Sequence, residues 1–128
     1  MSDLRPRGIP IEINGVERKI LFTLNAIDMI QEKYKKTLSE VLDMMLEGNL
    51  SDHVLRDVLL ILLEDERERE KYKDPDINIE QLTVKELGWF LSIDNQYDVM
   101  KLIFRAYGIS IPEPEEDDPN QESGQQSN

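Results

Sequence analysis

Apolar and polar residues alternate near the start of the chain, and farther on the apolar residues recur every three or four positions. The alternation runs from Ile9 to Phe22, and a period of two is typical of strands with one buried face. Asn14-Gly15 interrupts it, and these two residue types tolerate the positive φ angles of a type I′ turn. The stretch therefore predicts a β-hairpin with a two-residue loop.

The predicted hairpin has one apolar face. Its two-residue loop pairs Ile13 with Val16, Ile11 with Arg18 and Ile9 with Ile20. The apolar face then carries Ile9, Ile11, Ile13, Val16, Ile20 and Phe22, and the opposite face carries Glu12, Glu17 and Lys19. An isolated hairpin is only marginally stable in water, so we expect helices to cover the apolar face.

Two short amphipathic helices are predicted directly after the hairpin. Asn25 suits the N-cap of the first helix, which presents Ile27, Ile30 and Tyr34 on one side. The second helix follows Thr37-Leu38-Ser39-Glu40, a capping box in which Thr and Glu side chains accept hydrogen bonds from each other's main-chain N–H. We expect this helix to end at Gly48. Its apolar side carries Leu38, Val41, Leu42, Met45 and Leu46.

A third helix is predicted to lie at the centre of the core. Ser51 or Asp52 caps it, and it carries the longest apolar run of the chain, Val58–Leu63. The charged run that follows, Glu64–Lys73, contains several opposite-charge pairs, each of which contributes only about 0.2–0.5 kcal/mol on a helix surface. We expect this run to form a solvated helix end that leads into a loop at Asp74-Pro75.

Two further helices complete the predicted fold. Thr83-Val84-Lys85-Glu86 is a second capping box and opens a fourth helix. Asp94 or Asn95 caps a fifth helix, which Gly108 ends. The apolar positions of these two helices are Leu87, Phe90, Leu91, Val99, Met100, Ile103, Phe104 and Tyr107. The predicted fold is mainly α with a small N-terminal β-hairpin (α+β), and about five helices pack on the hairpin.

Composition divides the chain into three parts. We expect residues 1–8 to be a flexible N-terminus and residues 9–112 to form a single helical domain with an N-terminal β-hairpin. Residues 113–128 contain acids, Pro, Gln and Ser but no base, and such a segment buries too little apolar surface to offset its ordering entropy. They are predicted to form a disordered acidic tail.

The net charge of −12 restricts the classes of partner, and half of it comes from the predicted tail. A negative field repels phosphate backbones and anionic lipid headgroups, so we expect neither nucleic acid nor a membrane as partner. Met1–Gly8 has no apolar segment behind its arginines, and the six-residue run Val58–Leu63 is far shorter than the roughly 20 residues of a membrane span. The chain also lacks cysteine, which fits a reducing cytoplasm.

Few residues of the chain suit catalysis or metal binding. His53 is the only histidine, and its place in the first turn of a helix favours a surface or capping role. The segment Asp74–Asn78 resembles the opening of an EF-hand loop, but Ile79 occupies the glycine position and Lys85 the position of the bidentate glutamate. We therefore expect no enzyme activity, no metal and no cofactor.

Two features could contact a protein partner. Trp89 and Phe90 are adjacent on the fourth helix and cannot point the same way, so we expect one in the core and the other partly exposed as an anchor. The acidic tail is either a solubilising end or a second contact region. The predicted partner-binding residues are Trp89, Phe90, Glu113, Glu115, Glu116, Asp117 and Asp118.

The order of these motifs resembles a known family. The hairpin Ile11–Phe22, followed by Leu24–Tyr34, resembles the start of tail assembly chaperones of long-tailed bacteriophages, of the siphophage or prophage type. Leu55–Asp65 occupies the place of that family's central helix, and Gln81–Gly88 resembles its "leucine-threonine-x-x-glutamate" helix opening. The last helix, which ends near Tyr107 before a tail rich in proline and acids, is similar to that of the family as well. The resemblance covers roughly residues 9–112.

The resemblance implies a function in virion morphogenesis. It implies a non-enzymatic chaperone in the cytoplasm of the bacterial host, which binds the tape measure protein and helps to recruit tail tube subunits during tail assembly. It leaves open which segment of the tape measure protein is bound and whether the chaperone acts as a monomer or a ring. The alternative is an acidic DNA mimic, or another protein-interaction module, for which the net charge argues.

Overall fold

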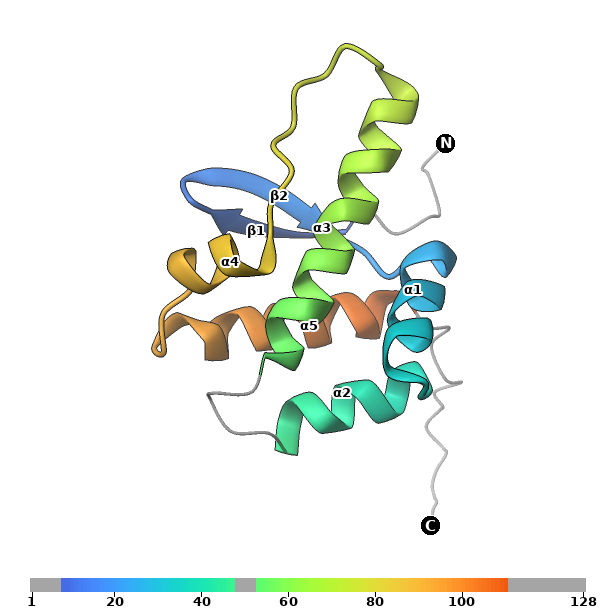
Figure 1. The fold of residues 1–128 in the computed structure, drawn as a ribbon, viewed down its shortest axis with the longest axis vertical. Coiled ribbons are helices and arrows are strands. Elements are labelled where there is room, and N and C mark those ends of the chain that lie inside the picture. Colours follow the sequence, from blue (N-terminus) through green and yellow to red (C-terminus); the bar gives the residue numbers. More distant parts are fainter. Residues whose placement is uncertain (1–7, 48–52, 111–128) are drawn as a thin grey trace, which may run out of the picture.

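The computed structural model describes residues 8–47 and 53–110, and it is mostly helical with an antiparallel two-stranded hairpin at its N-terminal end. Figure 1 shows the hairpin above α5 and the long helix α3 crossing the middle of the molecule. The predicted fold class is confirmed. The elements are β1 (Ile9–Ile13), β2 (Val16–Ile20), α1 (Leu24–Tyr34), α2 (Leu38–Glu47), α3 (Val54–Lys73), α4 (Val84–Phe90) and α5 (Asn95–Ser110).

The hairpin has the predicted register. Ile13 pairs with Val16, Ile11 with Arg18 and Ile9 with Ile20. Asn14 and Gly15 have φ angles of 52° and 79°, as the two central residues of a type I′ turn require. The turn chemistry of two residues thus decides which side chains share a face.

The apolar face of the hairpin differs from the prediction at two positions. Ile9, Ile11, Ile13, Ile20 and Phe22 are buried, but Val16 is 57% exposed. It follows the turn directly and lines an open groove between the turn and the segment Asn78–Leu82. Arg18, between Val16 and Ile20 on this same face, is buried instead.

Helix α3 is the centre of the core, as predicted, and it contacts β2 and all the other helices. Its apolar first half buries Val54, Leu55, Val58, Leu59, Ile61, Leu62 and Leu63. The helix continues without a break to Lys73, and the prediction of a solvated charged end is wrong at Asp65 and Glu66, which are both buried. The reason is that β2 and the start of α1 lie against this part of α3.

The helix caps agree with the sequence where both partners are local. In α2, Thr37 Oγ1 accepts from Glu40 N at 3.2 Å, and Glu40 Oε1 accepts from Thr37 N at 2.9 Å. Thr83 and Glu86 form the same capping box at the start of α4. Both predicted capping boxes are therefore confirmed. Gly48, predicted to end α2, lies outside the described residues, as do Ser51 and Asp52. The N-cap position of α3 is His53, whose side chain makes no capping hydrogen bond, so the prediction of Ser51 or Asp52 is wrong.

Three other predicted helix ends are wrong. Thr23, not Asn25, is the N-cap of α1, because its hydroxyl accepts from Ala26 N while it donates to Asp65 on α3. At the start of α5, Ser92 Oγ accepts from Asn95 N and Asn95 Oδ1 accepts from Ser92 N, so Ser92 takes the N-cap position predicted for Asp94 or Asn95, and Asn95 is its reciprocal partner. Helix α5 also runs through Gly108 to Ser110. Packing of α5 on β1, with an edge-to-face contact between Tyr107 and Phe22, outweighs the helix-breaking tendency of glycine.

Candidate functional site

The two adjacent aromatic residues of α4 point in different directions, as the sequence predicts. Phe90 is half-buried and packs against the core, whereas Trp89 is 71% exposed. Leu87 is fully buried, and Trp89 follows it by two residues, which is about 200° around the helix axis. Burial of Leu87 therefore turns Trp89 toward solvent, and its function as a partner anchor stays a prediction.

Helix α4 is held tightly against α3. The fully buried side chain of Leu87 fixes one side of α4 in the core, and the flexible end of the Arg56 side chain of α3 lies beside Gly88. Trp89 thus stands on a short helix whose opposite side is fixed to the core. A rigid aromatic side chain of this kind loses little conformational entropy when a partner binds it.

Two more large apolar side chains are exposed just after Trp89. Ile93, in the connection between α4 and α5, is 68% exposed, and Tyr97, in the first turn of α5, is 53% exposed. We call Trp89, Ile93 and Tyr97 the α4–α5 corner. The three residues lie within nine positions of the chain, and exposed apolar side chains that gather on a surface are typical of protein interaction sites. Of the three, the sequence predicted only Trp89 as a contact residue.

The other predicted contact residues are in the acidic tail. Glu113, Glu115, Glu116, Asp117 and Asp118 lie outside the described residues. Their contribution to binding stays a prediction.

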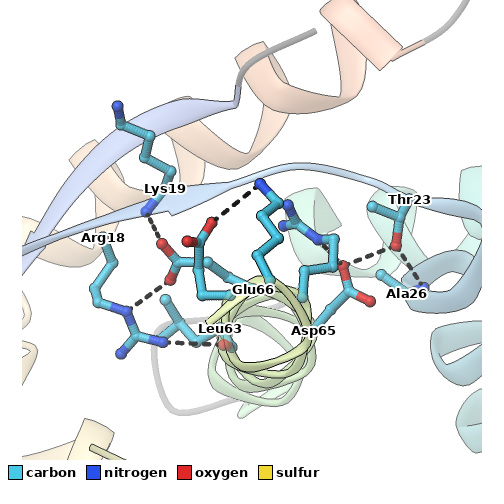
Figure 2. Close-up of polar contacts among 10 residues, drawn as sticks. Arg18, Lys19, Thr23, Ala26, Leu63, Asp65 and Glu66 are labelled. Atoms are coloured by element: carbon cyan, nitrogen blue, oxygen red, sulfur yellow. Dashed lines mark hydrogen bonds and ion pairs between the residues drawn. The ribbon is translucent and has the colours of Figure 1, made fainter. Parts of the chain in front are cut away.

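A buried ion pair joins the hairpin to α3, and the sequence patterns did not predict it. Arg18 Nε donates to Glu66 Oε1 at 2.6 Å, and Arg18 Nη2 donates to the main-chain oxygen of Leu63 at 3.0 Å. The second carboxylate oxygen of Glu66 accepts from the main-chain N–H of Lys19 at 3.0 Å. Figure 2 shows both oxygens of Glu66 engaged by the strand that lies over α3.

The neighbouring carboxylate of Asp65 makes a second connection. Its Oδ2 accepts from the hydroxyl of Thr23 at 2.8 Å and from Arg69 Nε at 2.9 Å. Figure 2 shows the Thr23 hydroxyl between Asp65 and the Ala26 N–H. We call Arg18, Glu66, Thr23 and Asp65 the hairpin–helix junction. Consecutive residues of α3 thus hold β2 and the start of α1.

A third buried carboxylate lies near the start of α3. Asp57 Oδ2 accepts from the Tyr34 hydroxyl at 2.5 Å and lies 3.0 Å from Nδ1 of His53. His53 is exposed, which agrees with the surface position expected from the sequence. The three buried acids of α3 are therefore all engaged with neighbouring elements, and their arrangement serves to fix α1 and β2.

The sequence does contain a signal for the junction. Leu55, Leu59 and Leu62 recur at steps of four and three, and Glu66 continues the same stripe four residues later. Arg18 likewise interrupts the apolar face of the hairpin. One base and one acid, each placed where an apolar residue is expected, indicate a buried pair.

Neither a metal centre nor a membrane span was found in the described part of the chain. Residues 8–47 and 53–110 contain no group of three or more His, Asp or Glu side chains that could hold a metal ion. In the loop after α3, the Asp74 carboxylate accepts from the main-chain N–H of Asp76. No helix in these same residues is long and apolar enough to cross a bilayer.

Comparison with known proteins leaves the family open. No protein-family model, curated protein or solved structure matches this chain. The resemblance to tail assembly chaperones therefore depends on the sequence motifs of residues 9–112 alone.

Proposed function

We propose that this protein is a non-enzymatic tail assembly chaperone of a long-tailed bacteriophage or prophage. It binds the tape measure protein in the cytoplasm of the bacterial host and helps to recruit tail tube subunits. The observation that carries the proposal is the α4–α5 corner, three exposed large apolar side chains within nine positions, in a chain whose motifs resemble this family.

The corner suits a long, aggregation-prone client. A chaperone of this kind needs surfaces that cover apolar side chains of the client and release them when tube subunits arrive. Trp and Tyr carry much of the binding free energy in protein interfaces, and an amphipathic helix can place its apolar face against them. A contact of only three such side chains is small enough to remain displaceable.

The order of the elements also supports the proposal. The family resemblance implies a tight hairpin, a central helix, a capped short helix and a last helix, in that order. The chain has β1–β2, α3, α4 and α5 in this order, and the capping box of α4 lies within the resembling stretch Gln81–Gly88.

Co-expression tests the proposal directly. The full chain is produced together with overlapping fragments of the tape measure protein encoded in the same genome, and the soluble fraction of each fragment is measured. We expect at least one fragment to become soluble and to copurify with the chain. Failure across the entire length of the tape measure protein would overturn the proposal.

A matched pair of variants tests the corner within the same experiment. Trp89→Ala should abolish copurification, because it removes the largest side chain of the corner. Tyr72→Ala is the control, since Tyr72 is an even more exposed aromatic residue near the end of α3, far from the corner in the fold. Equal binding by both variants would show that the client contacts another surface.

A further inference from the structure

A narrow groove lies beside the turn of the hairpin. It is about 280 Å³ in volume and separates the turn end of the hairpin from the segment Asn78–Leu82, which leads into α4. Figure 1 shows this segment passing the hairpin beside β2. Ile13, Val16, Ile79 and Leu82 form apolar walls. The groove thus borders the one apolar side chain of the hairpin face that no helix covers, Val16.

Buried hydrogen-bond donors of Arg18 also line the groove. A guanidinium group has five N–H groups, and those of Arg18 reach only Glu66 and the main-chain oxygen of Leu63 within the described residues. The side chain is only 7% exposed. Figure 2 shows the third nitrogen directed away from both partners. Buried N–H groups are almost always satisfied, so an acceptor is expected on this side of Arg18.

The outer edge of β2 offers main-chain groups next to the groove. The N–H of Lys19 points away from β1, because it donates to Glu66 on α3. Glu17, two residues earlier in the strand, directs its N–H and C=O to this same outer edge. Neither group has a partner in the part of the chain that the structure describes. An unpaired strand edge of this kind binds extended peptide segments.

The negative charge at the rim of the groove favours a peptide with basic side chains. Glu17 and Glu80 are exposed at its rim, and its single base, Arg18, is paired with Glu66. Glu12 lies directly opposite Glu17 in the hairpin and adds to the negative field. A basic side chain is therefore favoured beside Glu17, while the Arg18 donors call for a neutral acceptor such as a main-chain carbonyl.

We propose that this groove binds a short extended segment of a partner protein that alternates basic and apolar residues. A Lys or Arg of the segment lies beside Glu17, the next side chain is apolar and enters the groove against Val16, and a main-chain carbonyl accepts from Arg18. Adjacent side chains of a strand point to opposite faces, so one alternating segment satisfies both requirements. The proposal is independent of the tail assembly function.

The probe is the peptide acetyl-Ser-Lys-Ile-Lys-Val-Lys-Ser-amide, added to the full ¹⁵N-labelled chain. In the free protein the Glu17 amide should exchange with solvent rapidly, and peptide binding should slow this exchange while it shifts the Val16 and Glu17 signals. A Glu17 amide that is already protected in the free protein would overturn the proposal, because the groove would then be filled by the chain itself.

Two proline variants provide matched tests of the strand edge. Glu17→Pro removes the outward N–H and also the carboxylate beside the basic residue of the peptide, so it should weaken binding by at least about tenfold, the equivalent of one lost hydrogen bond. Glu12→Pro is the control, because Glu12 pairs with Glu17 but directs its N–H to the outer edge of β1. Both should fold, since Pro10 already occupies this type of position opposite Lys19. Equal weakening by both variants would contradict binding at the β2 edge.

A third variant and a second peptide test the groove itself. Val16→Lys should also weaken binding, and it should fold because Val16 is exposed; unchanged affinity would contradict insertion of an apolar side chain. A peptide with Glu in place of each Lys should not bind, and equal binding of the two peptides would overturn the proposal.

Self-association is a separate outcome. If the Val16 signals shift with protein concentration alone, a second copy of the chain occupies the groove, and the proposal is overturned.

Discussion

The hairpin–helix junction and the α4–α5 corner both place side chains in surroundings of the opposite polarity. The junction buries charged side chains and satisfies them with partners from β2, α1 and α3. The corner exposes large apolar side chains and gives them no cover within the described residues. The first arrangement fixes the fold, while the second leaves apolar side chains in solvent, where we propose that a partner protein binds.

The comparison shows that residue type alone does not separate structural from functional positions in this chain. The charged run of α3 looked like a solvent-facing surface, yet two of its acids, Asp65 and Glu66, hold the hairpin and α1 in place. Trp89, by its size and apolar character, would normally be counted as core, yet it is mostly exposed. Variants of the junction should therefore lower the stability of the fold, whereas variants of the corner should weaken partner binding and leave the stability nearly unchanged.

Loss of one partner of the buried ion pair should have the largest effect. Glu66→Ala leaves Arg18 buried without its carboxylate and should lower the free energy of unfolding by about 3–5 kcal/mol. Urea denaturation followed by circular dichroism measures this change. The double variant Arg18→Met/Glu66→Met removes both charges and should recover most of the loss. A double variant as unstable as Glu66→Ala would contradict the assignment of the cost to an unpaired buried charge.

Two substitutions on α4 should separate stability from binding. Leu87→Ala removes a fully buried side chain and should cost about 2–5 kcal/mol. Trp89→Ala should change the free energy of unfolding by no more than about 0.5 kcal/mol, because its side chain lies largely in solvent. Thermal denaturation of the two variants measures the difference. A strongly destabilised Trp89→Ala would mean that the corner belongs to the core.

Within the junction, the N-cap of α1 should contribute less to stability than the buried ion pair does. Thr23→Ala removes the acceptor for Ala26 N and the donor to Asp65, and it should cost about 1 kcal/mol, as loss of an N-cap does. Thr23→Ser keeps the hydroxyl and should retain most of the stability. Asn25→Ala is the matched control, and a larger loss there than at Thr23 would restore Asn25 as the cap.

The capping box of α2 should make the smallest contribution to the stability of the fold, because, unlike the junction, it is exposed to solvent. The main-chain N–H of Thr37, followed by the Thr37 side chain, lowers the pKa of Glu40 below its ordinary value of 4.5. The carboxylate therefore stabilises the fold above pH 4.5, and this contribution is lost as the pH falls through the lowered pKa. Titration of Glu40 by NMR should give a midpoint below 4.5; a midpoint at or above this value would contradict the prediction.

Local chemistry accounts for the features that the sequence predicted correctly. The register of the hairpin follows from Asn14-Gly15, and the starts of α2 and α4 follow from Thr and Glu three residues apart. The partners in each case are neighbours in the chain. The exposure of Trp89 was also foreseen in part, because two adjacent helical residues cannot both face the core, but which of the two is exposed depended on the burial of Leu87.

The features that were predicted wrongly depend on contacts between distant segments. Thr23 replaces Asn25 as the cap because Asp65 lies beside it, and α5 continues through Gly108 because it packs on β1. Arg18 and Glu66 are 48 positions apart, and although each interrupts an apolar pattern, no local rule shows that the two side chains meet. The groove beside the hairpin turn likewise exists only because Asn78–Leu82 returns to the hairpin.

The sequence by itself determined the secondary structure, the hairpin register and the division into one apolar and one polar face, because turns, caps and periodicity act between residues a few positions apart. Only the tertiary structure decided which charges are buried, which aromatic side chain is exposed and where the apolar face of the hairpin is left uncovered. These outcomes depend on which elements cover one another, and a side chain is buried or exposed according to neighbours that are far away in the sequence.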